Sequence, residues 1–294
     1  MLKRAIPLIL LVAVTGCSKS NDQLVQDLYS QNSQTRWSAA SKMMMKSGDR
    51  ELVEKLITVL DGDDERVVFI ATQVLGSLAD TLAVVPLGKL LDHPNADIRA
   101  RACWSIGSIG HYSGLDYLIK GLNDDNDTVR YSAVVAFGHL HYAPAVQHIF
   151  PMFYDPVDSV RVRAIQSLYY YRLDEDAKIL ASDFAPVLND KSDLVRYVAV
   201  QALGGAWEDV RGWVFRDSVV AGELLIESLR DSNKDVRIET IMSLKKIRYK
   251  KAVPVLMQMY DLASVDEEVA ISEAIKEITG ENFPPSEEAI KPEM

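Results

Sequence analysis

The chain has 294 residues, of which 48% are hydrophobic, and it carries a formal net charge of −10 at pH 7. That length and apolar content support one large domain or an extended repeat array with a continuous core. The acidic balance repels nucleic acid and anionic lipid headgroups, so it argues against nucleic-acid binding and favours a basic or neutral protein partner.

The first sixteen residues have the layout of a bacterial secretory signal. Lys3 and Arg4 form a positive start, and the apolar stretch Ile6–Val14 leads into small residues. This stretch is too short to span a bilayer as a helix, which takes about 20 residues. We therefore expect residues 1–16 to be removed from the mature protein.

Cys17 stands at the expected cleavage point. The segment Val14-Thr15-Gly16-Cys17 resembles the lipobox of bacterial lipoproteins, and this resemblance implies that Cys17 is lipidated. A polar tether over residues 17–32 would then join the lipid to the folded part. Ser18 resembles the residue found in outer-membrane lipoproteins, so the expected location is the outer membrane, facing the periplasm. The alternative is an ordinary signal peptide that ends in a chance cysteine.

An internal repeat of about 31 residues fills most of the remaining chain. Its marker residues are Arg36, Val68, Arg99, Arg130, Arg161, Arg196, Arg237 and Glu268, at intervals of 32, 31, 31, 31, 35, 41 and 31 residues. Three residues after each marker stands Ala, Thr or Ile, and seven after it stands a large apolar residue. This spacing predicts an amphipathic helix in every unit, here called the marker helix.

Each unit has the same expected plan. An acidic or Asn-rich turn supplies N-cap oxygens, the marker helix follows, and a tight turn leads into a second helix. We expect second helices at 82–91, 115–122, 145–153 and 252–260. Prolines in or near these segments predict local distortions, namely Pro86, Pro144, Pro151, Pro186 and Pro254.

The pattern Asp-x-x-Val-Arg-x-x-Ala-x-x-x-Phe-Gly in residues 127–138 resembles HEAT repeats of the short type that is also found in phycobilisome lyases. The ending Ile278–Phe283 resembles the closing segment of such arrays. The resemblance implies an all-α α-solenoid of about eight stacked helix pairs over residues 33–283, with second helices lining a concave face. Residues 284–294 are expected to form a disordered tail.

Asp/Arg pairs recur with the repeat. They resemble the ladder that ties each unit of such arrays to the next at the turns, so a structural role is expected for them rather than catalysis. The pairs are Asp97 with Arg99, Asp127 with Arg130, Asp158 with Arg161, Asp193 with Arg196, and Asp235 with Arg237.

The repeat breaks in units five and six. A tyrosine replaces the glycine near the end of the fifth marker helix, and the next two intervals grow by four and ten residues. The aromatic residues at these breaks are Tyr169, Tyr170, Tyr171, Trp207, Trp213 and Phe215. Because aromatic side chains anchor protein interfaces, they form the candidate partner-binding site. The alternative is that the rings fold back and fill an irregular gap between repeats.

No residue pattern predicts catalysis or a cofactor. His139 and His141 close a marker helix, and the His-Glu dipeptides through which HEAT-repeat deoxyhypusine hydroxylase holds two irons are absent, so no metal is expected. If Cys17 is lipidated, Cys103 has no disulfide partner, and its apolar surroundings predict a buried, inert thiol. The sequence has no Gly-x-Ser-x-Gly, Gly-rich phosphate loop, His-Glu-x-x-His or Cys-x-x-Cys.

The sequence therefore predicts a membrane-anchored, non-enzymatic scaffold or adaptor that binds proteins. Two alternatives remain open. One is an enzyme or accessory lyase with a metal or chromophore site on the concave face. The other is an immunity or inhibitor lipoprotein whose acidic surface binds a basic protein.

Overall fold

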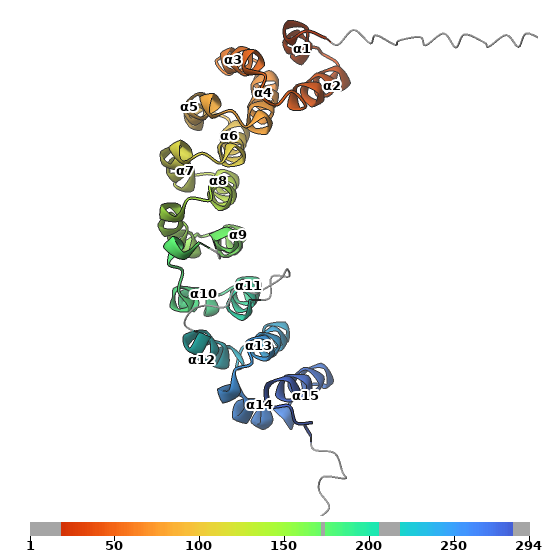
Figure 1. The fold of residues 1–294 in the computed structure, drawn as a ribbon, viewed down its shortest axis with the longest axis vertical. Coiled ribbons are helices and arrows are strands. Elements are labelled where there is room, and N and C mark those ends of the chain that lie inside the picture. The colour runs from red at the N-terminus through yellow and green to blue at the C-terminus, as the bar shows by residue number, and fades with distance from the viewer. Residues whose placement is uncertain (1–18, 172–173, 206–217, 285–294) are drawn as a thin grey trace, which may run out of the picture.

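The computed structural model describes residues 19–171, 174–205 and 218–284. In these ranges all regular structure is helical, and no helix is both long and apolar enough to cross a bilayer. Figure 1 shows two layers of helices along a curved, elongated stack. One layer contains the marker helices α2 (Ser33–Met44), α4 (Glu65–Leu78), α6 (Ala96–Ile109), α8 (Asp127–His139), α9 (Asp158–Leu168), α11 (Asp193–Gly204), α13 (Lys234–Lys246) and α15 (Val265–Thr279).

The second layer consists of shorter elements, several of them 3₁₀ helices. They are α1 (Asn21–Leu28), α3 (Arg50–Val59), η1 (Thr81–Ala83), α5 (Val84–Lys89), η2 (Leu90–Asp92), η3 (Tyr112–Gly114), α7 (Leu115–Leu122), η4 (Ala143–His148), η5 (Phe150–Tyr154), η8 (Ala181–Phe184), α10 (Ala185–Leu188), α12 (Ser218–Ser228), η9 (Lys250–Ala252) and α14 (Val253–Tyr260). Two further 3₁₀ helices, η6 (Tyr169–Tyr171) and η7 (Glu175–Ala177), follow α9.

The predicted solenoid is confirmed. Each marker helix packs against the second-layer element that precedes it and against the next marker helix. The two apolar columns of the repeat form the core, because every residue three or seven positions after a marker is at most 4% exposed. Residues four apart lie on one side of a helix, so these two columns give each marker helix a single buried face.

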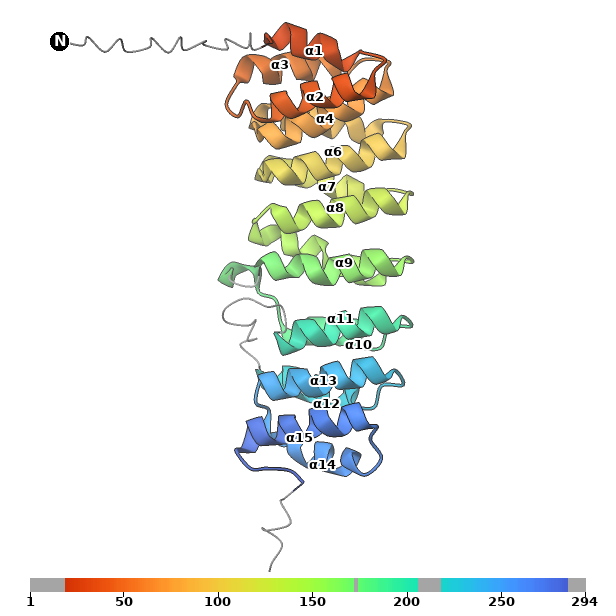
Figure 2. The ribbon, with the colours of Figure 1, turned by 90° about the vertical axis from the view of Figure 1, so that its right-hand side faces the viewer.

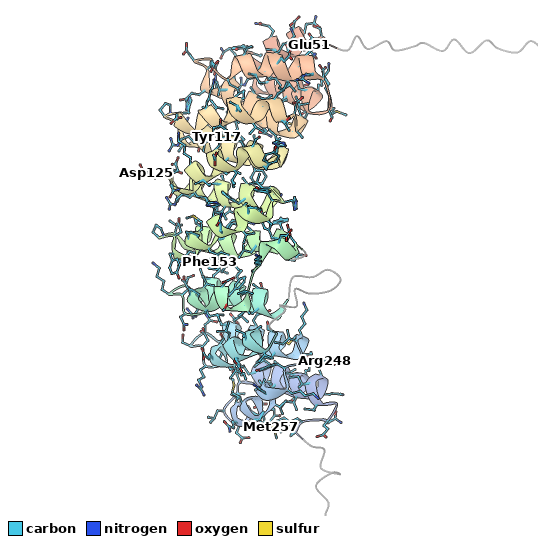
Figure 3. All side chains as sticks on the ribbon, turned by 60° about the vertical axis from the view of Figure 1, so that its left-hand side comes forward. Glu51, Tyr117, Asp125, Phe153, Arg248 and Met257 are labelled. Atoms are coloured by element: carbon cyan, nitrogen blue, oxygen red, sulfur yellow. The ribbon has the colours of Figure 1, made fainter. Side chains whose placement is uncertain are left out.

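Proline distorts the second layer, as the sequence predicts. Residues 143–154 form η4 and η5 in place of one α-helix, and each contains a proline in its first turn, Pro144 and Pro151. Proline removes a backbone donor and clashes with the preceding turn, so a continuous α-helix is disfavoured there. Side chains fill the layer along the whole stack (Figure 3). Phe153, labelled in that figure, lies 5.8 Å from Phe184 between ring centroids.

The expected tether over residues 17–32 is wrong for half of its length, because residues 21–28 form α1. Ser20 and Gln23 make a capping box at its start, and Leu24 and Leu28 are buried against α2 and α3. The array therefore begins with α1, which covers the apolar end of the stack as a terminal unit must. Cys17, the predicted signal peptide and nearly all of the predicted tail lie outside the described residues.

The concave face is formed by the marker helices and not by the second helices. Figures 1 and 2 show α4, α6, α8, α11, α13 and α15 on the inner side of the curve. The cause is close packing in this layer: a Cβ added to Gly107 would lie 2.5 Å from Cα of Ala136, and one on Gly204 would lie 2.8 Å from Cα of Ser243. Small residues let neighbouring marker helices approach closely, so this layer is the shorter one and the stack bends toward it.

Candidate functional site: the concave face

The exposed surface of the marker helices comes mainly from residues one, five and nine positions after each marker, which share one stripe of the helix. Several of these positions carry aromatic rings between α4 and α9. Trp104 on α6 and Tyr170 on η6 are 45% and 43% exposed. Such exposure is unusual for large rings within a continuous patch and is typical of interaction surfaces.

Contacts across successive units join these residues into one surface. Arg101 Cζ lies 4.6 Å from the ring centroid of Phe69, and the rings of Trp104 and His139 are 6.3 Å apart. Further along, Arg163 Cζ lies 5.0 Å from the ring of Tyr131, and the His139 and Tyr170 rings are 5.1 Å apart. We call this surface the central concave patch; it comprises Phe69, Arg101, Trp104, Tyr131, His139, Arg163 and Tyr170.

The three predicted tyrosines have different surroundings. Tyr171 is buried and its hydroxyl donates a hydrogen bond to the carbonyl of Phe137, so it serves packing. Tyr170 belongs to the central concave patch, and Tyr169 is partly buried with its ring 6.1 Å from that of Tyr170. The other predicted partner residues, Trp207, Trp213 and Phe215, lie outside the described residues.

A ladder of arginines runs along the turns of the array. Each donates through Nε to a carboxylate of the following unit at 2.6–2.7 Å: Arg99 to Asp124, Arg130 to Asp155, Arg161 to Asp190, Arg196 to Asp231, and Arg237 to Glu267. The same guanidinium also donates to the turn of its own unit, as Arg130 Nη1 does to the carbonyl of Asp124 at 3.0 Å. Each rung therefore joins two consecutive turns.

The aspartates predicted as the acidic half of this ladder are not the carboxylates that pair with its arginines. Asp97, Asp127, Asp158, Asp193 and Asp235 stand in the first turns of their helices. There a carboxylate interacts favourably with the positive end of the helix dipole. Each ladder arginine instead reaches across the turn and donates to a carboxylate of the next unit. In four rungs this carboxylate lies six residues before the following marker, and in the last rung it is Glu267.

Several carboxylates of the ladder have a pKa below the ordinary value of their group. The hydrogen bond from Arg99 lowers the pKa of Asp124 below its ordinary value. Burial alone would raise the pKa of Glu267, but hydrogen bonds from Arg237 and Ser264 outweigh it and lower that pKa to about 2. The ladder is therefore a set of buried ion pairs with a structural role.

The ladder is incomplete at the N-terminal end. Arg36 donates to two carbonyls, but its Nε is buried without a partner. At the junction of units one and two, Gly62 stands where later units have the carboxylate. At the junction of units two and three, Val68 replaces the arginine and His93 replaces the carboxylate. The first two junctions of the array therefore lack the arginine–carboxylate rung.

The histidines and the cysteine of the described residues have surroundings that can be compared with the sequence prediction. No group of three or more His, Cys, Asp or Glu side chains there is arranged to hold a metal ion. Burial is the main cause that lowers the pKa of His139, and the charges of His141 and Arg163 lower it further. The His139 imidazole is therefore neutral at pH 7. Cys103 is buried, and this burial raises the pKa of its thiol to about 12, which leaves almost no thiolate for nucleophilic attack.

A second feature of the concave face is an acidic groove of about 420 Å³ between α11 and α13. Its side chains include Asp193, Leu194, Tyr197, Asp235, Ile238 and Glu239. Burial and the nearby Glu239 raise the pKa of Tyr197. The concave face thus combines a central area of rings and arginines with an acidic groove between α11 and α13.

The sequence analysis did not identify five members of the central concave patch, Phe69, Arg101, Trp104, Tyr131 and Arg163. A signal was available for Phe69 and Tyr131: the residue after each marker is apolar or aromatic in all eight units, although the core columns lie elsewhere. A second apolar stripe on a helix whose core face is already assigned indicates an exposed interaction surface.

Comparisons with known proteins agree with this architecture. A phycocyanobilin lyase subunit alpha of Picosynechococcus sp. is 26% identical over 175 residues, which cover 54% of this chain and 63% of that protein. The crystal structure of YibA from Escherichia coli superimposes with a TM-score of 0.60 at 20% identity, covering 88% of this chain and 92% of YibA. The complex of CpcE and CpcF of phycocyanin lyase from Nostoc sp. gives a TM-score of 0.45 at 18% identity, covering 92% of this chain and 98% of that one.

These similarities concern the fold, and the match to the lyase subunit spans less than two thirds of that protein. The family described as HEAT repeats matches residues 84–169 and 181–276, which together exceed half of the chain. With its stacked helix pairs and its arginine ladder, the chain belongs to the HEAT-repeat family.

Proposed function

We propose that this HEAT-repeat protein is a scaffold or adaptor that binds a partner protein on its concave face and does not catalyse a reaction. The observation that carries the proposal is the central concave patch, where exposed rings and arginines gather on a rigid surface. Aromatic and arginine side chains supply most of the binding energy in protein interfaces. Away from this patch, the net charge of −10 and the acidic groove between α11 and α13 favour a partner that also carries a basic segment.

The proposal includes a membrane anchor. A lipid on Cys17 would hold the array beside the outer membrane, facing the periplasm, because α1 begins only a few residues later at Asn21. Acyl chains would then provide the attachment that the acidic surface does not. Mass spectrometry of the mature N-terminus tests this part: acyl mass on Cys17 supports it, and an unmodified mature chain that begins elsewhere refutes it.

A second candidate function comes from the similarity to the phycocyanobilin lyase subunit. An accessory role in attaching a chromophore would use the same concave face. Visible absorbance that copurifies with the full-length protein would favour this candidate over a scaffold.

Affinity capture from native membranes tests the scaffold proposal. Truncating Trp104 to Ala should lower recovery of the partner at least tenfold, since a central interface Trp contributes about 2 kcal/mol or more. Tyr154, 72% exposed on η5 in the second layer, supplies a matched control, and Tyr154→Ala should leave recovery unchanged. Equal recovery with both variants would contradict binding through the concave face.

A further inference from the structure

We propose that the central concave patch binds an extended segment of its partner that carries two carboxylates on either side of an apolar side chain. Arg101 and Arg163 would receive the carboxylates, and Trp104 and its neighbouring rings would receive the apolar group. This inference rests on the proposed scaffold function and adds the chemistry of the segment that is bound.

Arg101 is the first observation. Its guanidinium is partly buried over the ring of Phe69, and among the described residues it makes no hydrogen bond and no ion pair. Burial lowers its pKa, as expected where no carboxylate compensates the charge. An arginine offers five N–H donors, so this group has its full donor capacity available to a ligand.

Arg163 repeats the arrangement two units further along the stack. It stacks on Tyr131 and donates from Nε to the Tyr131 hydroxyl at 3.0 Å, and it has no carboxylate partner among the described residues. The ladder arginines from Arg99 onward, by contrast, each donate to a carboxylate at 2.7 Å or less. The ladder arginines thus join consecutive turns through carboxylates, whereas Arg101 and Arg163 stack on rings of the concave face and have no carboxylate partner among the described residues.

Stacking prepares these two arginines for carboxylate binding. An aromatic face fixes the guanidinium plane, and a free guanidinium edge matches a carboxylate in a bidentate pair. Within the part of the chain that the structure describes, both edges of Arg101 are without a partner, whereas Nε and Nη2 of Arg163 donate to the Tyr131 hydroxyl and leave its Nη1 for a ligand. A partly buried cation without a counter-charge is also unfavourable, because it has already lost part of its hydration. A carboxylate of the ligand would therefore displace little water and break no existing ion pair when it binds. Both effects favour an anionic ligand over a neutral one.

The spacing of the two arginines limits the length of the ligand. Arg101 lies on α6 and Arg163 on α9, with α8 between them. Packed helices lie 8–10 Å apart, so the two sites are roughly 20 Å apart. An extended chain rises about 3.3 Å per residue, so two carboxylates about six residues apart would reach both sites. Trp104 stands on α6 one turn after Arg101, its ring lies 6.3 Å from that of His139 on α8, and these two rings would cover the intervening apolar residue.

The overall acidity of the protein makes this arrangement selective. The patch is a local basic area on a chain of net charge −10. Long-range repulsion disfavours strongly acidic polymers such as nucleic acid, while a segment with two carboxylates and an apolar centre can satisfy the local groups.

Fluorescence anisotropy with three labelled peptides tests the proposal on the full-length protein. Each peptide has Leu-Phe at its centre, flanked by two Glu, two Gln or two Lys placed six residues apart. We expect the Glu peptide to bind at least tenfold more tightly than the Gln peptide, and the Lys peptide to bind most weakly, since one charged hydrogen-bonded pair is worth about a factor of ten. A single-stranded oligothymidine serves as the competing class of ligand.

Variants assign the effect to the two arginines. Arg101→Gln and Arg163→Gln should each weaken the Glu peptide about tenfold, and the double variant should bind the Glu and Gln peptides alike. Arg50→Gln, which changes an exposed arginine on α3, should have no effect, and equal melting temperatures would show that the variants are folded. Failure of the Glu peptide to bind at about 1 mM, equal affinity for all three peptides, or preference for the oligonucleotide would overturn the proposal.

The outcome is separable from that of the scaffold proposal. If Trp104→Ala abolishes capture of the native partner while Arg101→Gln and Arg163→Gln leave capture unchanged, the scaffold function stands and the carboxylate assignment is wrong. If Trp104→Ala also leaves capture unchanged, the concave face is not the binding surface.

Discussion

Removing the carboxylate of Asp155 tests whether the ladder stabilises the array. Asp155 accepts hydrogen bonds from Arg130 Nε at 2.7 Å, from Arg130 Nη2 at 3.0 Å and from the amide of Val157 at 2.9 Å. The two charged side chains are only 2% and 12% exposed. Asp155→Ala would leave a buried, unpaired guanidinium, and breaking such a pair costs about 3–5 kcal/mol.

The assay is urea denaturation followed by circular dichroism. Asp127→Ala is the matched control, because that exposed aspartate forms no rung and its loss should stay within about 0.5 kcal/mol. Adding Arg130→Met to Asp155→Ala should recover part of the loss, since no unpaired buried cation would remain. If Asp155→Ala lowers the free energy of unfolding no more than Asp127→Ala does, the rungs contribute no more than surface ion pairs, and the account of the ladder is refuted.

Three further predictions concern packing, the missing rung and pH. Gly107→Ala should destabilise the fold by about 1–3 kcal/mol in the same assay, because its Cβ would lie 2.5 Å from Cα of Ala136; a smaller loss would show that the marker helices can separate freely. Gly62→Asp should raise the melting temperature by giving Arg36 Nε the carboxylate that it lacks. A lower melting temperature would contradict this and would show that the added Cβ, 3.2 Å from the carbonyl oxygen of Val59, costs more than the new pair contributes. Because the pKa of His139 is lowered in the fold, the unfolded chain binds more protons than the folded one below about pH 6.5, and stability should fall from pH 7.5 to 5.5. His139→Gln should flatten the dependence of the melting temperature on pH. An unchanged dependence would exclude His139 as its source.

The repeat columns could be predicted from the sequence because they are local. Residues three and seven after each marker share a helix face, so their chemistry alone identifies the core. The Asn caps of α6, α8 and α13 could be predicted for the same reason. Pro144 and Pro151 likewise indicated the irregular segment 143–154, whereas Pro254 stands in the first turn of the regular helix α14, where proline is tolerated.

Features that depend on contacts between units could not be predicted from the repeat pattern alone. The partner of each ladder arginine lies 25 to 35 residues away, for example Asp124 for Arg99 and Asp231 for Arg196, so proximity in sequence pointed to the wrong aspartate. Helix α1 was missed because it is short and has only two fully buried leucines, although its Ser20–Gln23 capping box was a usable signal. The direction of curvature depends on which layer packs more closely, and a single unit does not determine that.

Site-specific photocrosslinking in living cells tests the central claim most directly, that a partner protein binds on the concave face. A photoreactive phenylalanine analogue would replace Trp104 or Tyr170 on the concave face, and Val85 on α5 in the second layer as the control. The account predicts one discrete crosslinked partner from both concave positions and none from Val85. The same product from Val85, or no product from either concave position, would contradict it.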